Sequence, residues 1–232
     1  RYPPHVRDTL SKQIDYLLSQ GVIIETPDIE FASPILAVRK QIRASNKHLH
    51  KDKSKLPLRL VIDLRGVNQR VKSYQKFHIP NLGSVLDLIA EKKAKYYSKI
   101  DLVSGYFQAA LHPDSYKYTG FIWQGKTYAW TRLCQGLISS PAHFQRLLTF
   151  ILRKYVHKSV LIYLDDCLIF SPCFETHLKH IDEVLSAFEK AGMKLSWDKS
   201  RFALQTIEFL GHSINPYGLA PSSQHVEAMA TF

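Results

Sequence analysis

The chain has 232 residues, of which 45% are hydrophobic and 12% aromatic, so it can bury a core and is not intrinsically disordered. Its 31 Lys and Arg residues against 20 Asp and Glu give a formal charge of +11, which favours polyanionic partners such as nucleic acid. No apolar run reaches the roughly 18 residues of a membrane span, and the three cysteines show neither a disulfide framework nor the spacing of zinc ligands.

The first half of the chain shows helical and strand patterns in turn. Apolar residues three and four positions apart predict a helix over His5–Gln20, which a glycine ends. Apolar runs at Pro34–Lys40 and Leu56–Leu64 predict two strands joined by a basic stretch. A short helix is expected over Asn81–Ala90, and an apolar strand over Tyr96–Asp101.

The second half adds a hairpin, two long helices and two further strand pairs. Gln124–Gly125 is a hairpin signal between strands expected at Tyr116–Trp123 and Lys126–Leu133. Beyond it we expect, in chain order, a helix over Ser139–His157, two strands within Val160–Ser171, a helix over Glu175–Ala191 and a strand pair within Ile207–Ile214. This order predicts an α+β fold, with subdomain boundaries near Tyr74–Pro80 and after Leu111.

Basic residues gather in two places. Eight Lys and Arg residues lie between Arg39 and Arg59 with Asp52 as the only acid, which predicts a basic tip between two strands. A second cluster precedes Asp101 and consists of Lys92, Lys93, Lys95 and Lys99. Because this cluster leads directly into an acid, we expect a positive rim that holds phosphates near an acidic centre. A basic surface kept for solubility is the alternative.

Two adjacent acids, Asp165 and Asp166, occupy the tip of an apolar hairpin, where like charges repel unless a cation offsets them. A solvated turn is the alternative, because Asp is common in turns. Asp101 follows its strand just as Asp165 follows the strand that begins at Val160, so adjacent strands would bring both acids to one edge of a sheet. Three carboxylates could bind two Mg²⁺ or Mn²⁺ ions, the arrangement that catalyses nucleotidyl transfer.

Several motifs together resemble the reverse transcriptases of retroelements. The two central motifs are Tyr163–Asp166, within its apolar hairpin, and Asp101–Gln108 upstream. The others follow in the order usual for the family and are Arg59–Asn68, Gln135–Gly136, Ser140–Phe144, Ala191–Leu195 and Phe209–His212. The resemblance spans most of Ser33–Ala220 and is closest to Gypsy-type long-terminal-repeat retrotransposons. It implies an RNA-directed DNA polymerase with a right-hand fold, which uses deoxynucleoside triphosphates and both RNA and DNA templates with an annealed primer.

The resemblance implies a role for each residue of the site. Asp101 and Asp165 would be the principal ligands of two Mg²⁺ ions, for which Mn²⁺ can substitute, with Asp166 as an auxiliary ligand. Tyr106 would lie under the incoming sugar and exclude a 2′-hydroxyl, the alternative being a buried tyrosine. Arg59 would reach the triphosphate from the fingers, a task that suits a guanidinium because it stays charged and binds bidentately.

Further residues are assigned by the resemblance to the nucleotide and the primer. Gln135 would contact the incoming nucleotide or the template, unless it is a plain loop amide, and Gly136 would let the backbone approach closely. Lys199 would lie near the leaving pyrophosphate, with a solvated lysine as the alternative. Contacts with primer or template are expected from Pro141, Tyr163, Phe209, Leu210, Gly211 and His212. The last four would form a turn that grips the primer end, the alternative being a plain strand turn.

One residue departs from the pattern of the family. Cys134 stands where the family usually has proline, directly before Gln135. This substitution leaves the shape of the loop open.

The resemblance also predicts the domain organisation and the surroundings of the chain. We expect an N-terminal helix and extension at 1–32, fingers at 33–80 and 111–133, and palm at 81–110 and 134–232, ending at the primer-grip region. The chain opens with Arg1 and no leader, so we expect a longer polyprotein that supplies the thumb, connection and RNase H domains. A cytoplasmic location in virus-like particles is expected, with nuclear entry also open, and no membrane partner. A domesticated module that only binds nucleic acid and a two-metal nuclease are the rival functions.

Overall fold

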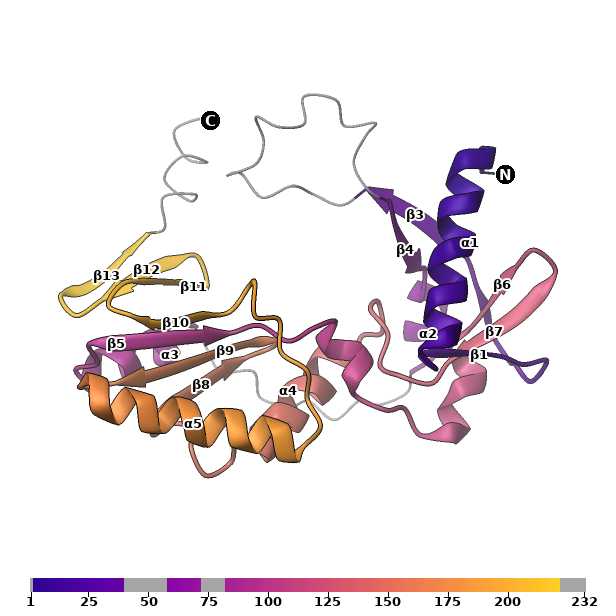
Figure 1. Cartoon of the computed structure of the whole chain (residues 1–232). Helices are drawn as coiled ribbons and strands as arrows, with labels where there is room; N and C mark the ends of the chain where they lie inside the picture. The colour runs from indigo at the N-terminus through magenta and orange to yellow at the C-terminus, as the bar shows by residue number, and fades with distance from the viewer. Residues whose placement is uncertain (1, 40–57, 72–81, 222–232) are drawn as a thin grey trace. The chain divides into compact units, whose positions relative to one another are not determined.

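A computed structural model describes residues 2–39, 58–71 and 82–221 of the chain. Most of the basic stretch between Arg39 and Arg59, and the boundary expected near Tyr74–Pro80, lie outside these residues. The chain divides into two compact units: unit 1 holds Arg1–Gln75 and Tyr106–Ser140, and unit 2 holds Lys76–Gly105 and Pro141–Phe232. Figure 1 labels the elements of each unit. Among the described residues, no helix is both long enough and apolar enough to cross a bilayer.

Unit 1 combines one long helix with a four-stranded sheet and a two-stranded ribbon. The sheet has the order β1-β7-β6-β2, and the ribbon pairs β3 with β4. The helices are α1 (Pro4–Ser19) and α2 (Arg65–Asn68), with the 3-10 helices η3 (Gly105–Gln108), at the boundary, and η4 (Pro113–Tyr118). The strands are β1 (Ile23–Glu25), β2 (Ala32–Ser33), β3 (Ile35–Arg39), β4 (Leu58–Ile62), β6 (Gly120–Trp123) and β7 (Lys126–Trp130). All of these pairs are antiparallel except β2 with β6.

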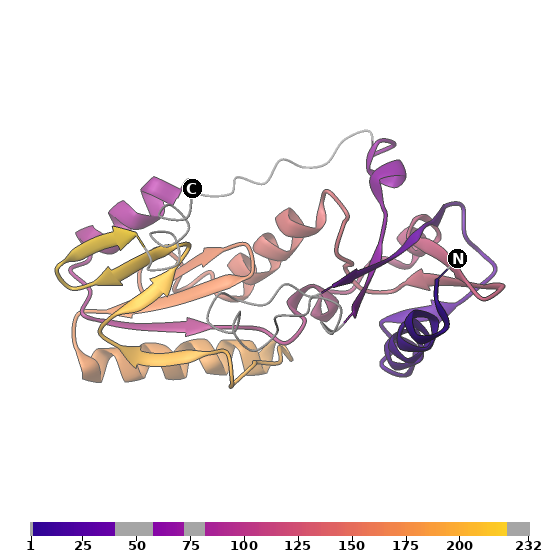
Figure 2. The ribbon, with the colours of Figure 1, turned by 90° about the horizontal axis from the view of Figure 1, so that it is seen from above.

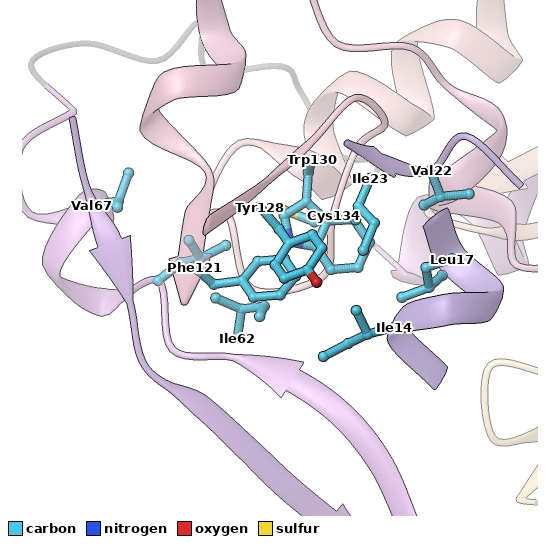
Figure 3. Close-up of a cluster of buried hydrophobic side chains, with 11 residues drawn as sticks. Ile14, Leu17, Val22, Ile23, Ile62, Val67, Phe121, Tyr128, Trp130 and Cys134 are labelled. Carbon is cyan, nitrogen blue, oxygen red and sulfur yellow. The ribbon is translucent and has the colours of Figure 1, made fainter. Parts of the chain in front are cut away.

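The core of unit 1 joins α1 to the sheet, as Figure 3 shows. The helix contributes Ile14 and Leu17, whose side chains are 1% and 8% exposed. Phe121 and Tyr128 face each other across the β6–β7 pair, and their rings stack with centroids 5.3 Å apart. The helix predicted over His5–Gln20 is thus confirmed, because its residues three and four positions apart face one apolar core.

The strand expected at Tyr116–Trp123 begins only at Gly120, so its first half is a wrong prediction. The 3-10 helix η4 takes up the preceding residues, and the hydroxyl of Thr119 donates to the carbonyl of Tyr116 at 2.8 Å where that helix ends. A side chain at position 120 would place its Cβ 2.6 Å from the carbonyl oxygen of Phe31. Glycine therefore permits the close parallel pairing of β6 with β2.

Unit 2 is built on a four-stranded antiparallel sheet with the order β10-β5-β9-β8. A three-stranded sheet, β11-β12-β13, follows it along the chain. The strands are β5 (Tyr96–Ile100), β8 (Val160–Tyr163), β9 (Asp166–Ser171), β10 (Arg201–Leu204), β11 (Ile207–Phe209), β12 (His212–Asn215) and β13 (Gly218–Pro221), and the helices are α3 (Leu82–Glu91), α4 (Ser140–Ile151) and α5 (Phe174–Lys190). Helices combined with largely antiparallel sheets confirm the predicted α+β class.

Different elements cover the two faces of the four-stranded sheet. On one face, α5 places the ring of His177 against Ser98 and Ser171, at 2.7 and 2.8 Å from their hydroxyl oxygens. On the other face, Ile89 of α3 joins Tyr97 and residues of β11 and β12 in a buried cluster. Seen from above, α5 and α3 lie on opposite sides of the sheet (Figure 2). This layering follows the alternation of side chains along β5.

α4 is shorter than the helix predicted over Ser139–His157, and the prediction is wrong at its C-terminal end. The helix stops at Ile151 because the chain has to reverse into β8. The carbonyl of Tyr155 accepts backbone N–H groups at 3.0 to 3.1 Å, those of Lys158, Ser159 and Val160. The other strands and helices predicted after position 157 are confirmed to within a few residues.

Candidate active site

One edge of the four-stranded sheet carries the predicted acids. The pairing of β8 with β9 leaves Leu164 and Asp165 as a two-residue turn, after which β9 begins at Asp166. β5 ends opposite the start of β9, so Asp101 leaves the sheet at this same edge. The strand pattern predicts this meeting correctly, although the neighbour of β5 is β9 rather than β8.

Asp165 lies among like charges. Burial raises the pKa of its carboxyl above the ordinary value of an aspartate, and the charges of Asp166 and Asp101 raise it further. These effects oppose ionisation, because they penalise the negatively charged form. A cation bound at this edge would favour the charged form and offset them.

Two lysines lie beside the acids. The Nζ atom of Lys99 is 2.6 Å from Oδ1 of Asp166, and the two side chains are 23% and 30% exposed. The Nζ atom of Lys199 is 3.8 Å from Oδ1 of Asp101, and the lysine side chain is 62% exposed. The first contact is a close ion pair, whereas the second leaves an ammonium group open to solvent next to an acid.

The oxygen donors at this edge suit a hard divalent cation. Asp101 and Asp165 are the two carboxylates that would hold it, since Asp166 is paired with Lys99. Within residues 2–39, 58–71 and 82–221, no three His, Cys, Asp or Glu side chains form a metal-binding group. Asp101 and Asp165 therefore offer carboxylates to a cation at this edge, while Oδ1 of Asp166 is paired with Lys99.

Gln145 of α4 holds the turn that carries Asp165, and no role was predicted for it. Its side-chain Nε2 donates to the carbonyl of Ile162 at 3.0 Å, and its Oε1 accepts the backbone N–H of Leu164. Gln145 is 2% exposed, so both bonds are shielded from water. The backbone of Leu164 has φ +57°, a left-handed conformation that a leucine rarely adopts and that the surrounding contacts have to stabilise.

Only Lys99 of the second basic cluster lies at the acidic edge, so the predicted positive rim is wrong for its other members. The backbone N–H of Lys95 donates to the carbonyl of Ser171, the last residue of β9, at 2.9 Å. Lys95 therefore lies at the opposite end of β5, roughly 20 Å from Asp101 at about 3.3 Å per residue. Lys92 and Lys93 precede it in the turn after α3.

Four of the residues assigned to the nucleotide belong to unit 1. Arg59 is an exposed residue of β4, and Tyr106 is a half-buried residue of η3. Gln135 is half-buried and Gly136 exposed in the loop that precedes α4. Their expected roles at the acids of unit 2 stay predictions.

Asn68 holds the loop around Gln135, although no role was predicted for it. Its Nδ2 donates to the carbonyl of Gly136 at 2.8 Å, and its Oδ1 accepts the backbone N–H of Ile138 at 2.9 Å. Gly136 has φ +104°, and a Cβ there would lie 3.2 Å from the carbonyl oxygen of Ile62. A side chain at this position would thus crowd the backbone of Ile62, and the approach of Gly136 to a nucleotide stays a prediction.

Cys134 is buried in the core of unit 1 directly before this loop. Burial raises the pKa of its thiol to about 12, so the side chain stays protonated. The hydroxyl of Ser140 donates to the carbonyl of Cys134 at 2.8 Å. Hydrogen bonds from Ser140 and Asn68 therefore shape the loop in which the family usually has proline.

The turn predicted to grip the primer is a tight hairpin. Phe209 pairs with His212, and the two residues between them, Leu210 and Gly211, have φ of +52° and +79°. Phe209 is 1% exposed, and the Nζ atom of Lys99 lies 5.8 Å from its ring centroid. The side chain of Phe209 thus packs in the core, and a contact with a primer would come from the other three residues.

The remaining two residues assigned to the primer or template also belong to unit 2. Tyr163 ends β8 opposite Asp166, and Pro141 lies in the first turn of α4. Both are half-buried. Their contacts with nucleic acid stay predictions.

The chain is similar to known proteins over most of its length. Residues 39–214 match the family described as reverse transcriptase (RNA-dependent DNA polymerase). The chain is 32% identical to the retrovirus-related Pol polyprotein from transposon 297 of Drosophila melanogaster, over 96% of this chain and 20% of that protein. It is 30% identical to the corresponding polyprotein from transposon gypsy of the same organism, over 98% of this chain and 21% of the relative. The chain thus spans about a fifth of the length of these relatives.

Solved structures show the same similarity. A foamy viral protease-reverse transcriptase in complex with double-stranded DNA has a TM-score of 0.82 and 30% identity, over 97% of this chain and 36% of that chain. A foamy viral protease-reverse transcriptase in complex with an RNA/DNA hybrid has a TM-score of 0.81 and 27% identity, over 99% of this chain and 28% of that chain.

Proposed function

Since this chain belongs to the reverse transcriptase (RNA-dependent DNA polymerase) family, we propose that it is the catalytic region of a retrotransposon polyprotein. It extends a primer by adding deoxynucleotides to the 3′ end, with RNA or DNA as template. The observation that carries this proposal is the meeting of Asp101 and Asp165 at one edge of the sheet, with Asp166 beside them.

The acids of this edge would hold divalent cations. Asp101 and Asp165 supply the principal ligands for two Mg²⁺ ions, for which Mn²⁺ can substitute, and Asp166 is auxiliary. When bound, such ions supply the Lewis-acid chemistry of nucleotidyl transfer, which activates the primer 3′-hydroxyl and offsets charge on the leaving pyrophosphate. The hydrogen bonds of Gln145 hold the turn that carries Asp165. They therefore fix the position of this carboxylate at the site of the chemistry.

Cationic side chains complete the site. Lys199 is exposed beside Asp101, which supports a role in attracting the pyrophosphate or in donating a proton to it. Arg59 binds the triphosphate, and Gln135 contacts the nucleotide or the template. Tyr106 closes the space that a 2′-hydroxyl would need, and the turn from Leu210 to His212 contacts the primer.

We assign 1–32 to an N-terminal helix and extension, 33–80 and 111–133 to the fingers, and 81–110 and 134–232 to the palm. The similar foamy viral enzymes were solved with double-stranded DNA and with an RNA/DNA hybrid, which supports a primer annealed to either kind of template as the partner here. Thumb, connection and RNase H domains would come from the rest of the polyprotein. We place the enzyme in cytoplasmic virus-like particles, with nuclear entry as a later step.

Primer extension by a polypeptide that contains this chain and a thumb domain tests the proposal. With Mg²⁺ and deoxynucleoside triphosphates, we expect extended primers on both RNA and DNA templates. Cleaved strands without extension would identify a nuclease instead. Tight binding of the template-primer that needs no metal, together with no extension, would identify a module that only binds nucleic acid.

A further inference from the structure

The backbone of Asp101 is held by a short turn that lies far from it in the sequence, from Ser196 to Ser200. The carbonyl of Asp101 accepts the backbone N–H of Ser196 at 2.8 Å. The backbone N–H of Asp101 donates to the side-chain oxygen of Ser200 at 3.1 Å. Both polar groups of this peptide backbone are therefore satisfied by one turn.

The two segments also run together beyond Asp101. The backbone N–H of Val103 donates to the carbonyl of Lys194 at 3.0 Å, and Leu102 forms a β-bridge with Leu195. The turn is thus anchored to the strand end by backbone bonds at several points, and the side chain of Ser200 adds a bond to the backbone of Asp101.

The direction of each bond at the Ser200 hydroxyl follows from its partners. The hydroxyl has one proton, which it donates to the carbonyl of Ser196 at 2.8 Å. A lone pair then remains to accept the N–H of Asp101, which can only donate. Ser200 is 4% exposed, so water does not readily replace either bond.

The same turn carries Lys199. The backbone N–H groups of Lys199 and Ser200 both donate to the carbonyl of Ser196, at 3.3 and 2.9 Å. Arg201 closes the turn from its other end, since its Nη1 donates to the carbonyls of Asp198 and Ser200 at 2.7 and 2.8 Å. Lys199, with its Nζ atom 3.8 Å from Oδ1 of Asp101, is thus the neighbour of Ser200 in the sequence. The hydroxyl of Ser200 holds the backbone of the same aspartate.

We propose that Ser200 is a positioning residue, which fixes the carboxylate of Asp101 and the ammonium of Lys199 relative to each other through its hydroxyl. The inference rests on the proposed function, because it matters for catalysis only if these two groups act on metal and nucleotide. Removing the hydroxyl leaves the N–H of Asp101 without its partner. The strand end then gains freedom where the reacting groups need a fixed geometry.

A matched pair of variants isolates the hydroxyl. Ser200→Thr keeps it, and a threonine Oγ1 can still bond the carbonyl four residues earlier. Ser200→Val introduces a side chain of nearly the same shape as threonine but without the hydroxyl. If added bulk at this buried position prevented folding of both, Ser200→Ala would remove the hydroxyl without a larger side chain, and the parent serine would be its comparison.

Three measurements on the polymerase with its thumb domain test the proposal. Amide hydrogen exchange at Asp101 should be faster in Ser200→Val than in Ser200→Thr. The affinity for Mn²⁺, followed by electron paramagnetic resonance in the complex with template-primer, should fall severalfold in Ser200→Val. In single-nucleotide addition, kcat should fall about tenfold with little change in the KM for nucleotide, because geometry rather than binding is lost. Ser200→Thr should restore all three.

Ser171→Ala is the matched control for the loss of a buried serine hydroxyl. Ser171 lies at the far end of β9 and bonds to His177 and His180 at 2.8 and 2.7 Å. We expect it to lower stability without changing kcat or Mn²⁺ affinity. Equal kcat and Mn²⁺ affinity in Ser200→Val and Ser200→Thr would overturn the inference while leaving the polymerase assignment intact. A parent enzyme that fails to extend primers would instead refute the proposed function, and amide exchange would still report on Ser200.

Discussion

Gln145 fixes the backbone of Leu164 at the tip of the acidic turn. Its side-chain carbonyl accepts the N–H of Leu164, while its NH₂ group donates to Ile162 at 3.0 Å. Because a side-chain amide offers one acceptor and two donors in fixed directions, a single residue holds the backbone at Ile162, on the strand that leads into the turn, and at Leu164 in the turn itself. The position of Asp165, the next residue, therefore depends on a helix that contributes no acid to the site.

Replacing Gln145 by Met, which has a similar shape but bonds neither group, should free this turn. We expect kcat for nucleotide addition to fall about 10- to 100-fold, because a displacement of about 1 Å at a reacting group can cost this much. Stability should fall by about 1–3 kcal/mol, since two buried backbone groups lose their partners. Thr149→Val is the control one turn further along α4, and it should leave kcat unchanged. Equal kcat in both variants would contradict the role of Gln145.

Asn68 should act in the same manner on the loop of Gln135. Asn68→Ala removes the bonds to Gly136 and Ile138, and we expect the KM for deoxynucleotide to rise about tenfold with a smaller change in kcat. Steady-state single-nucleotide addition measures both constants. Gln69→Ala changes the exposed neighbouring residue and should have no effect. An unchanged KM in Asn68→Ala would show that the loop does not need the two hydrogen bonds of Asn68, or that Gln135 does not contact the nucleotide.

Tyr106 is expected to exclude ribonucleotides by its bulk. Tyr106→Ala should raise the ratio of ribonucleotide to deoxynucleotide incorporation by about tenfold or more, a discrimination of about 1.4 kcal/mol. Tyr106→Phe keeps the ring and should keep the discrimination. If both variants preserve the preference for deoxynucleotides, the tyrosine is only a packing residue.

Stability should depend on pH through a buried histidine in unit 2. Burial lowers the pKa of His177 from 6.5 to about 4, and the neighbouring His180 adds to this shift. Between these two values the unfolded chain binds a proton that the folded chain does not, so stability falls as the pH is lowered through this window. We expect a loss of about 2 kcal/mol between about pH 7 and pH 5, measured by urea unfolding.

The variant His177→Asn should lose this component of the pH dependence. His143 is exposed on α4, and His143→Asn should keep the dependence of the parent chain. If the parent and His177→Asn lost the same stability between the two pH values, the buried histidine would not be the cause of the pH dependence.

Some of these features could be predicted from the sequence for a clear physical reason. A helix such as α1 shows itself through the spacing of residues like Ile14 and Leu17, which is set by the helix alone. The meeting of Asp101 and Asp165 could be predicted because each ends an apolar strand, and strands of one sheet share an edge. Both inferences need only local pattern and one topological rule.

Other features depend on packing that no local pattern encodes. β10 gives no alternating pattern, since Ala203 has φ +52° and the register with β5 shifts within the strand. The positive rim predicted from the basic cluster before Asp101 is wrong for three of its four lysines. These three precede β5, and only Lys99 lies near the end of that strand. The ion pair of Lys99 with Asp166 and the hydrogen bond of Gln145 to Leu164 join different elements of the fold. The spacing of residues along the sequence could not reveal them.

The most direct test of the catalytic edge is single-turnover primer extension by Asp165→Asn beside Asp182→Asn, both in the polymerase with its thumb domain. Asp182 is an exposed acid of α5, so the two variants carry the same change in charge. We expect the rate of Asp165→Asn to fall by at least about 100-fold, since a ligand of the cations that activate the 3′-hydroxyl is lost. Asp182→Asn should react like the parent enzyme. Equal rates for the two variants would contradict the proposed active site.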